Sequence, residues 1–269
     1  MPKPFLLEDL EKEGKRLGIP PSYKRALIRE YLQTKIIYYL YNLKGSKNLS
    51  FIEGTSLRLL RNLDRFSEDL DFDNLGLNFK QIQELFKKVT SLLQRDGFKV
   101  EFDIKKTNDS GIGEIKFIGL LEDLKISRHS REKLVIKINY TTPYVKPILE
   151  NVILSRFGFV QNVITNEESF LLAQKINAII RRKDIQPRDF YDVVWFASRN
   201  IPVSSLLFKI TGIKDKVDIL KEIEKKYYQL EKQKKVFKKR LTPFLIHKEN
   251  IKYLDLFKKI IVKVIENMT

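Results

Sequence analysis

The chain has 269 residues, 43% of them hydrophobic, and carries 51 Lys and Arg against 34 Asp and Glu, a formal net charge of +17. This size provides for a packed core in one large or two modest domains, while the absence of cysteine excludes disulfides and thiolate metal sites. No long apolar run predicts a membrane span, and acids enter the N-terminal stretch too early for a secretory signal, so we expect a cytoplasmic protein.

The first 145 residues alternate between helix and strand patterns. Apolar spacing predicts helices over 21–43, 56–63 and 79–94, and short or alternating runs predict strands over 48–53, 70–72, 98–104, 112–120 and 133–140. Such a mixture is typical of an α+β fold with a mixed or antiparallel sheet.

The remainder of the chain is almost wholly helical in pattern. A connecting strand is expected at 157–165, and helices are expected at 166–182, 188–198, 203–210, 214–238 and 249–267, with 214–238 the longest. We therefore place an α+β domain at residues 1–150 and a helical domain at 151–269, with a soft boundary in the zone 145–165.

Two carboxylates, Asp69 and Asp71, lie one residue apart in a predicted strand. Side chains at positions i and i+2 of a strand point to the same face, so the two charges are held side by side, which is costly unless a cation neutralises them. Oxygen ligands of this kind suit Mg²⁺, which is usually shared with substrate phosphates. Upstream, Gly54, Thr55 and Ser56 form a predicted turn whose N–H groups can face phosphate oxygens. The stretch predicts metal-dependent chemistry on a nucleoside triphosphate.

A second cluster follows in the helical half. Lys175 lies in the middle of an apolar helical stretch, where an ammonium group can be held near a phosphate, and Asp189 and Asp192 begin the next helix. Both clusters also have a purely structural interpretation. Asp73 would extend the acidic pair into a charged strand edge, and Lys175 would extend its side chain out of an apolar face.

Basic residues are concentrated near the C-terminus. Residues 201–269 hold 17 Lys and Arg against eight Asp and Glu, and the densest run is EKQKKVFKKR at 231–240. A basic patch of this kind attracts phosphate backbones, so Lys234, Lys235, Lys238 and Lys239 are candidate RNA contacts. The alternative is an ordinary solvated helix face.

The two clusters together resemble the AbiEii/AbiGii family of nucleotidyltransferase toxins. In that family a G-G-T-[SA]-L turn precedes R-[FY]-S-x-D-[LI]-D, and an A-x-K-[LI]-x-A helix precedes R-D-x-x-D. The matching stretches here are GTSL at 54–57, RFSEDLD at 65–71, AQKINA at 173–178 and RDFYD at 188–192. Order and spacing both fit, over about residues 20–200.

The resemblance implies a DNA polymerase β-like nucleotidyltransferase domain, followed by a helical domain that completes the active site. It implies a toxin of a bacterial toxin–antitoxin or abortive-infection system, with a cognate antitoxin encoded nearby. Some members transfer nucleotides to the 3′ end of tRNA, which stops translation. We therefore expect an Mg²⁺-dependent enzyme whose partners are a nucleoside triphosphate and an RNA acceptor, with tRNA as the expected RNA.

The resemblance also assigns roles to residues. Asp69 and Asp71 would bind Mg²⁺, and Lys175 would neutralise charge on the triphosphate, while Asp189 would either orient Lys175 or position the attacking hydroxyl. The nucleotide phosphates would be contacted by Gly54, Thr55 and Ser56 together with Lys175, and Arg65 would either contact a phosphate or steady the strand.

Two positions depart from the pattern. Glu53 stands where the family has its first glycine, and the strand at 133–140 offers Lys137 and Asn139 where polymerase β-like enzymes commonly have a third carboxylate. Either the acidic pair suffices for the metal, or a third acid comes from elsewhere, with Asp189 as the candidate and Asp192 less favoured. Two other functions stay open: a nucleotidyltransferase acting on a protein or small molecule, and a non-catalytic nucleic-acid-binding protein with a decayed site.

Overall fold

The structure, a computed structural model, describes residues 7–127, 129 and 132–268. By their internal contacts these residues form two units. The first comprises the chain up to residue 62 together with 66–143 and 149–165, and the second comprises 63–65, 144–148 and the residues from 166 onward.

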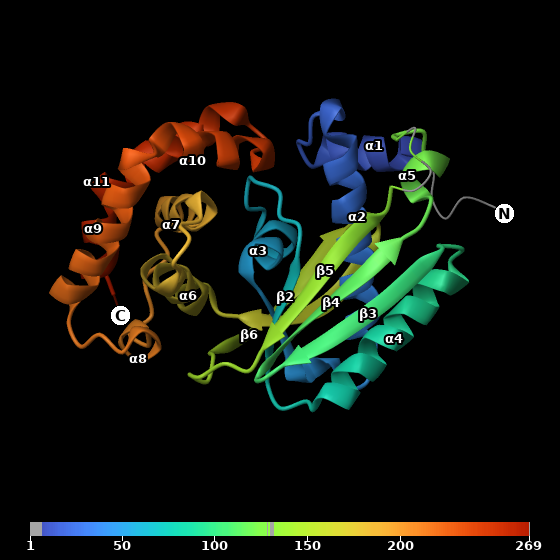
Figure 1. The fold of residues 1–269 in the computed structure, drawn as a ribbon, viewed down its shortest axis with the longest axis horizontal. Coiled ribbons are helices and arrows are strands. Elements are labelled where there is room, and N and C mark those ends of the chain that lie inside the picture. The colour runs from blue at the N-terminus through green and yellow to red at the C-terminus, as the bar shows by residue number, and fades with distance from the viewer. Residues whose placement is uncertain (1–6, 128, 130–131, 269) are drawn as a thin grey trace. The chain divides into compact units, whose positions relative to one another are not determined.

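The first unit is built on a seven-stranded sheet with the strand order β3-β4-β5-β2-β1-β7-β6 (Figure 1). Its strands are β1 Leu49–Ile52, β2 Leu70–Asn74, β3 Val100–Thr107, β4 Ser110–Phe117, β5 Leu134–Thr141, β6 Leu149–Arg156 and β7 Phe159–Asn166. Its helices are α1 Leu7–Arg16, α2 Lys24–Tyr41, α3 Glu53–Arg61, α4 Phe79–Arg95 and α5 Leu120–Asp123. Strand β2 pairs antiparallel with β1 and parallel with β5. The predicted α+β class with a mixed sheet is therefore confirmed.

One face of this sheet is apolar and covered. Helix α4 contacts β3, and α2 contacts α4 and β5. The Phe86 ring of α4 lies 5.9 Å from Phe72 of β2 and 6.1 Å from Phe102 of β3. Side chains alternate between the two faces along a strand, so the residues directly before and after Phe72 in β2, and before and after Phe102 in β3, point to the opposite face. That opposite face is polar, and it carries the acidic pair.

Helix α3 is held by a buried ion network. Arg58 of α3 donates to the carboxylate of Glu30 in α2 at 2.8 and 3.2 Å, and Arg156 of β6 donates to the same carboxylate at 2.6 Å. Arg156 also donates to the carbonyls of Leu59 and Arg58 at 2.9 and 2.8 Å, near the C-terminal end of α3. Such carbonyls have no partner within their own helix, so the buried guanidinium both balances Glu30 and satisfies the helix end.

The second unit is helical. Its helices are α6 Glu168–Arg181, α7 Pro187–Ser198, α8 Leu207–Thr211, α9 Lys216–Lys232, α10 Lys234–Leu241 and α11 Tyr253–Glu266. The Phe257 ring of α11 packs edge-on against Phe190 of α7, at 4.7 Å between ring centroids, and stacks on Tyr227 of α9 at 5.5 Å. Among the described residues, no helix combines the length and apolar character needed to cross a membrane.

Two sequence-based expectations were wrong. The helix expected over 214–238 is broken at Gln233, whose φ of −119° and ψ of 25° leave the helical region. Helix α9 then packs on α6 and α11, whereas α10 packs on α7, so the two helices contact different neighbours.

Strand β6 is absent from the sequence-based prediction. It leads into β7 through a two-residue turn in which Phe157 and Gly158 both have positive φ, a conformation that the apolar periodicity does not reveal.

Candidate active site

Asp69 and Asp71 lie on the polar face of the sheet in the first unit. Asp69 directly precedes β2, and Asp71 lies within it, opposite Ile52 of β1 and Asn139 of β5. Both aspartates are half-buried. The predicted side-by-side placement on a strand follows from their i, i+2 spacing. Asn139 donates from Nδ2 to Oδ1 of Asp71 at 2.9 Å, a contact that pairs an amide with the acidic pair.

The backbone that leads into this strand is fixed from two sides. Gln33 of α2 donates from its side-chain amide to the carbonyls of Ser67 and Glu68 at 3.1 and 2.9 Å. The Thr55 hydroxyl of α3 donates to the carbonyl of Asp69. The Thr55 side chain therefore holds Asp69 through the backbone, and this bond ties the GTSL stretch to the RFSEDLD stretch. Sequence analysis had not singled out Gln33, which is remote in sequence.

The Gly54, Thr55 and Ser56 segment is not the exposed turn that we expected. It is the first turn of α3, which begins at Glu53, and all three residues are buried. The Ser56 hydroxyl donates to the Glu53 carbonyl at 2.9 Å. The expectation failed because an abrupt strand-to-helix junction leaves no room for a separate turn. The first N–H groups of a helix have no partner within the helix, and the phosphate contact expected of this segment stays a prediction.

Glu53 adopts a conformation that suits glycine. Its φ of 64° lies in the left-handed region, which costs a residue with a Cβ about 1 kcal/mol. This is the position where the family has its first glycine. Glu53 therefore places a side chain at a backbone position whose positive φ suits glycine.

We expect Glu53→Gly to stabilise the protein relative to Glu53→Ala by about 1 kcal/mol. Both variants remove the carboxylate, but only glycine relieves the strain at positive φ. Urea unfolding measured by circular dichroism would report the difference. Equal stability of the two variants would show that the positive φ carries no cost.

The second predicted cluster is a buried ion network in the second unit. The Lys175 ammonium lies 3.4 Å from Oδ1 of Asp189 and 3.2 Å from Oδ2 of Asp192. Arg182 reaches the other oxygen of Asp189 at 2.7 Å. Lys175 is 4% exposed, Asp189 is 2% and Asp192 is fully buried. The expected pairing of Lys175 with Asp189 is present, and Asp192, the less favoured acid, is an equal partner.

Arg65 joins the same network. Its guanidinium donates from Nε and Nη2 to the two carboxylate oxygens of Asp192, each at 2.7 Å, a bidentate geometry. Burial alone would raise the pKa of Asp192, but the charges of Arg65 and Lys175 outweigh burial and hold that pKa below its ordinary value. One ion pair therefore connects the RFSEDLD and RDFYD stretches, which explains why they occur together. The phosphate contact expected of Arg65 stays a prediction.

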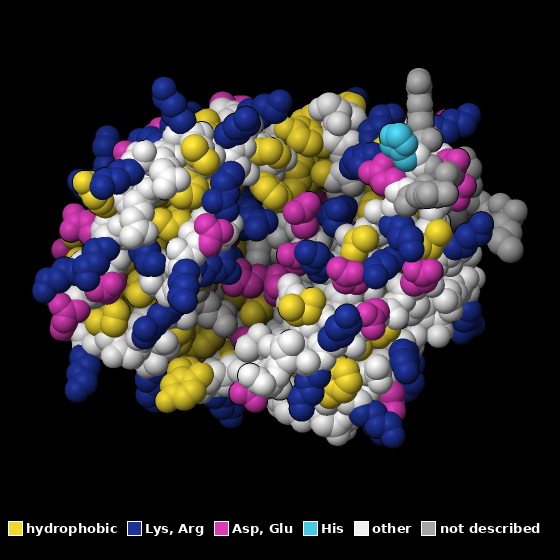
Figure 2. Space-filling view, viewed as in Figure 1, with side chains coloured by type: hydrophobic (Ala, Val, Ile, Leu, Met, Phe, Trp, Pro, Cys, Tyr) yellow, Lys and Arg dark blue, Asp and Glu magenta, His cyan; other side chains and the backbone are white. Residues whose placement is uncertain are grey.

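The basic run at 231–240 is partly neutralised by its own surroundings. Lys234 and Lys238 form ion pairs with Asp255 of α11 at 2.8 and 2.9 Å. The hydrogen bond to Asp255 is the main cause that holds the pKa of Lys234 above its ordinary value. Lys235 and Lys239 are exposed. Over the visible face Lys and Arg are interspersed with Asp and Glu (Figure 2).

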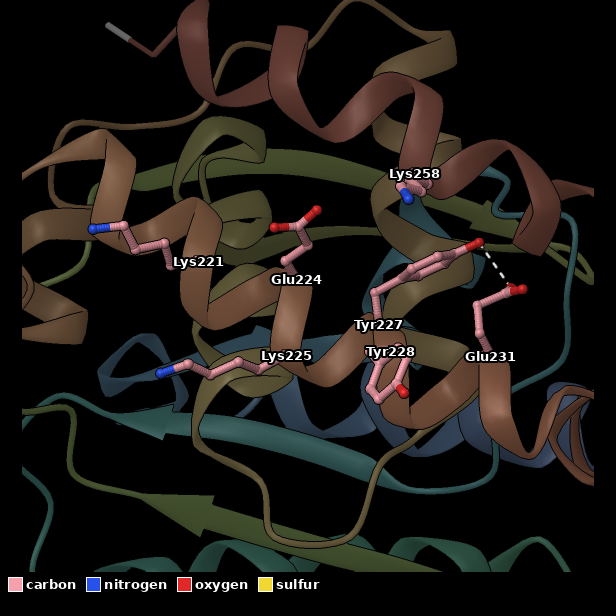
Figure 3. A pocket seen from close by; sticks show the side chains of 7 residues that line it. All are labelled: Lys221, Glu224, Lys225, Tyr227, Tyr228, Glu231 and Lys258. Carbon is pink, nitrogen blue, oxygen red and sulfur yellow. Dashed lines mark hydrogen bonds between the residues drawn. The ribbon is translucent and has the colours of Figure 1, made fainter.

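A groove of about 510 Å³ lies on the second unit (Figure 3). Its wall includes Lys221, Lys225 and Tyr228 of α9 and Lys258 of α11. Tyr228 is 62% exposed, and the ammonium of Lys232 lies 4.5 Å from its ring centroid. The spacing of Lys221, Lys225 and Tyr228 along α9 already places them on one helix face, whereas the approach of Lys258 depends on the packing of α11 against α9.

The donor set at Asp69 and Asp71 fits a divalent cation shared with a substrate. Two carboxylates on one strand face provide oxygen ligands, and Mg²⁺ is usually bound by one or two carboxylates together with substrate phosphates. Within the described residues no group of three or more His, Cys, Asp or Glu side chains is arranged to hold a metal by itself. The two carboxylates are therefore suitable ligands for such an ion, and the ion itself stays a prediction.

A mixed sheet that carries an Asp-x-Asp pair, with Gly54, Thr55 and Ser56 in the first turn of the neighbouring helix, is the arrangement expected of a nucleotidyltransferase. The family model described as "Nucleotidyl transferase AbiEii toxin, Type IV TA system" matches residues 40–257. The chain belongs to this family, so it is a nucleotidyltransferase toxin of the toxin–antitoxin type, and the resemblance stated from the sequence is confirmed. Membership implies a nucleoside triphosphate substrate and a cognate antitoxin. The search of curated proteins found no match.

Solved structures show the same fold. A putative nucleotidyltransferase from Helicobacter pylori has 19% identity and a TM-score of 0.58, over 90% of this chain and 96% of that one. JHP933 from the same species has 19% identity and a TM-score of 0.56, over 90% and 94%. The nucleotidyltransferase toxin MenT4 from Mycobacterium tuberculosis has 21% identity and a TM-score of 0.50, over 73% of this chain and 66% of MenT4. The chain thus spans about two thirds of MenT4.

Proposed function

We propose that this toxin is an Mg²⁺-dependent enzyme of the cytoplasm that transfers nucleotides from a nucleoside triphosphate to RNA, with the 3′ end of tRNA as the acceptor, and so blocks translation. The observation that carries the proposal is the Asp69–Asp71 pair on the polar sheet face, with the Asn139 amide hydrogen-bonded to Asp71. This donor set suits a metal delivered with triphosphate oxygens.

In the proposed reaction Asp69 and Asp71 hold the ion, and Gln33 and Thr55 keep Asp69 in place through its backbone. When bound, Mg²⁺ supplies positive charge to the triphosphate and to the departing pyrophosphate. The acceptor hydroxyl forms a bond to the α-phosphorus, the bond to the β-phosphate oxygen breaks, and the hydroxyl proton passes to solvent. Lys175, oriented by Asp189, is proposed to add positive charge. The chain contributes mainly positioning and electrostatic stabilisation.

Two surface features support RNA as the acceptor. The net charge of +17 favours a polyanion over a small uncharged acceptor. The groove on α9 and α11 is lined by two tyrosines and three lysines, and also by Glu224 and Glu231 (Figure 3). Aromatic rings interleaved with basic side chains are typical of surfaces that bind single-stranded nucleic acid.

The test is incubation of the purified protein with each α-labelled nucleoside triphosphate and total RNA, with and without Mg²⁺. Label should enter RNA of tRNA size only with Mg²⁺, and it should be lost when the tRNA 3′-hydroxyl is oxidised with periodate beforehand. Label in protein or in small molecules would support the alternative transferase. Absence of label with every nucleotide would contradict a catalytic role.

Within the basic run we expect Lys235 and Lys239 to contact RNA more than their neighbours do. The double variant Lys235→Gln/Lys239→Gln should reduce the slope of log Kd against log salt by roughly 1.4–1.8, because each lost phosphate contact contributes about 0.7–0.9. The matched control is Lys234→Gln/Lys238→Gln, whose lysines pair with Asp255. Fluorescence anisotropy with labelled tRNA gives both slopes. An equal fall in the two variants would show that the ion pairs do not decide which lysines bind RNA.

A further inference from the structure

Asn139 occupies a structurally fixed position beside Asp71. Strands β2 and β5 run parallel, with Leu70 opposite Ile138, Asp71 opposite Asn139 and Phe72 opposite Tyr140. A slip of one residue would move Ile138 and Tyr140, both buried, onto the polar face. The 2.9 Å contact from Nδ2 of Asn139 to Oδ1 of Asp71 is therefore a consequence of sheet register.

An amide at this position differs from a carboxylate in charge and in hydrogen bonding. The amide nitrogen donates, so it restrains the rotation of the Asp71 carboxylate by holding one of its oxygens. A carboxylate oxygen has more than one lone pair, so the contact and metal coordination are compatible. A carboxylate at position 139 would instead add a negative charge beside Asp71, which would repel it in the absence of metal and strengthen divalent-cation binding.

We propose that Asn139 is the positioning residue for Asp71 and that its neutrality makes metal binding depend on the nucleotide. Asn139 orients Asp71 for coordination, while the acidic pair alone attracts a divalent ion weakly. The phosphates of the nucleoside triphosphate then supply the missing negative charge and oxygen ligands. The inference rests on the proposed metal-binding role of Asp69 and Asp71. It adds the uncharged residue Asn139 to that site.

The two substitutions of Asn139 should act in opposite directions. Asn139→Ala removes the hydrogen bond and should weaken Mn²⁺ binding, measured with a non-hydrolysable triphosphate analogue, by about 10–100-fold, the range found when a partner of a metal ligand is lost. Asn139→Asp adds a carboxylate and should tighten Mn²⁺ binding without nucleotide by at least about tenfold. A loss of packing alone would not weaken Mn²⁺ binding in Asn139→Ala and strengthen it in Asn139→Asp.

The experiment is titration of the intact chain with Mn²⁺, with free ion followed by electron paramagnetic resonance, with and without the analogue. Thr141→Ala is the matched control, because Thr141 lies on the same strand two residues further and faces Asp73 in register. We expect its Mn²⁺ affinity to equal that of the wild type. Thermal melts of each variant establish that it is folded.

A fourth variant separates this inference from the proposed function. If Asp71→Asn weakens Mn²⁺ binding while both Asn139 variants bind like the wild type, or shift in the same direction, the role of Asn139 is overturned and the metal role of Asp71 stands. If Asp71→Asn has no effect on Mn²⁺ binding, the metal assignment itself fails, and the inference fails with it.

Discussion

Replacement of Asp71 or Asp69 by asparagine is expected to reduce nucleotidyl transfer by at least about 10³-fold and to leave the fold intact. The loss follows because a metal that stabilises the transferring phosphoryl group contributes several kcal/mol, and each 1.36 kcal/mol corresponds to a factor of ten in rate. Stability should hold or rise, since two adjacent carboxylates repel each other without a cation. Incorporation of labelled nucleotide into RNA measures the first effect, and thermal unfolding measures the second.

Glu68→Gln is the matched control for this experiment. Glu68 is the exposed neighbour of Asp69 in the same RFSEDLD stretch, and its replacement removes the same unit of charge. Its activity should stay close to that of the wild type. If Asp71→Asn transfers nucleotides at the wild-type rate, Asp71 is no metal ligand, and its acidic pair belongs to a charged strand.

The acidic pair was predictable because its geometry is local. Two residues in a strand face the same side whatever the rest of the chain does, so Asp69 and Asp71 follow from the alternation of residues 69–73 alone. The contact between Asn139 and Asp71 depends on the register of strands that are 68 positions apart in sequence. From the sequence, Asn139 is recognisable only as a residue at the position of an expected acid, since register across β2 and β5 is decided by burial in the assembled sheet.

The ion network around Asp192 also depends on a contact between residues that are far apart in sequence. The spacing of Lys175, Asp189 and Asp192 places them on consecutive helices, but nothing local shows that the partner of Asp192 is Arg65, 127 positions away. The sequence leaves two roles open for Arg65, a contact with the nucleotide phosphates and a structural role in steadying the strand. Composition and periodicity do not indicate that its partner is the fully buried carboxylate of Asp192.

The Gly-Thr-Ser segment was misjudged for a different reason. Small polar residues are typical of turns, and here they begin a helix that starts abruptly at the end of β1. The left-handed φ of Glu53 makes that junction possible, and a glutamate at this position conceals the signal that a glycine would have given. Strain at a non-glycine residue is therefore the part of this site that is least visible in the sequence.

The pair Arg65–Asp192 carries the largest expected effect on stability. Both side chains are almost fully buried, at 2% and 0% exposure, and they are joined by two hydrogen bonds of 2.7 Å. Removing one member of a buried pair leaves the other charge without its main partner, which costs about 3–5 kcal/mol. We expect Arg65→Ala or Asp192→Ala to reach that loss, and to lower the melting temperature by roughly 10 °C.

The pH dependence offers a second observable for the same pair. Because the pKa of Asp192 is held below its ordinary value in the folded protein, its contribution to stability is present above the pKa of the unfolded chain, near 4. That contribution is lost as pH falls through the lower folded pKa. The unfolding free energy of the wild type should therefore fall over this acid range, and Asp192→Ala should flatten this part of the curve.

A double-mutant cycle decides whether Arg65 and Asp192 act on each other. Replacing both residues, as Arg65→Ala/Asp192→Ala, removes both charges of the pair, so the double variant should lose clearly less stability than the sum of the two single losses. Lys221→Ala serves as the control, because its pair with Asp218 is exposed and should change stability by less than about 0.5 kcal/mol. Urea unfolding of the four members measures the coupling. Strictly additive losses would contradict a direct interaction between Arg65 and Asp192.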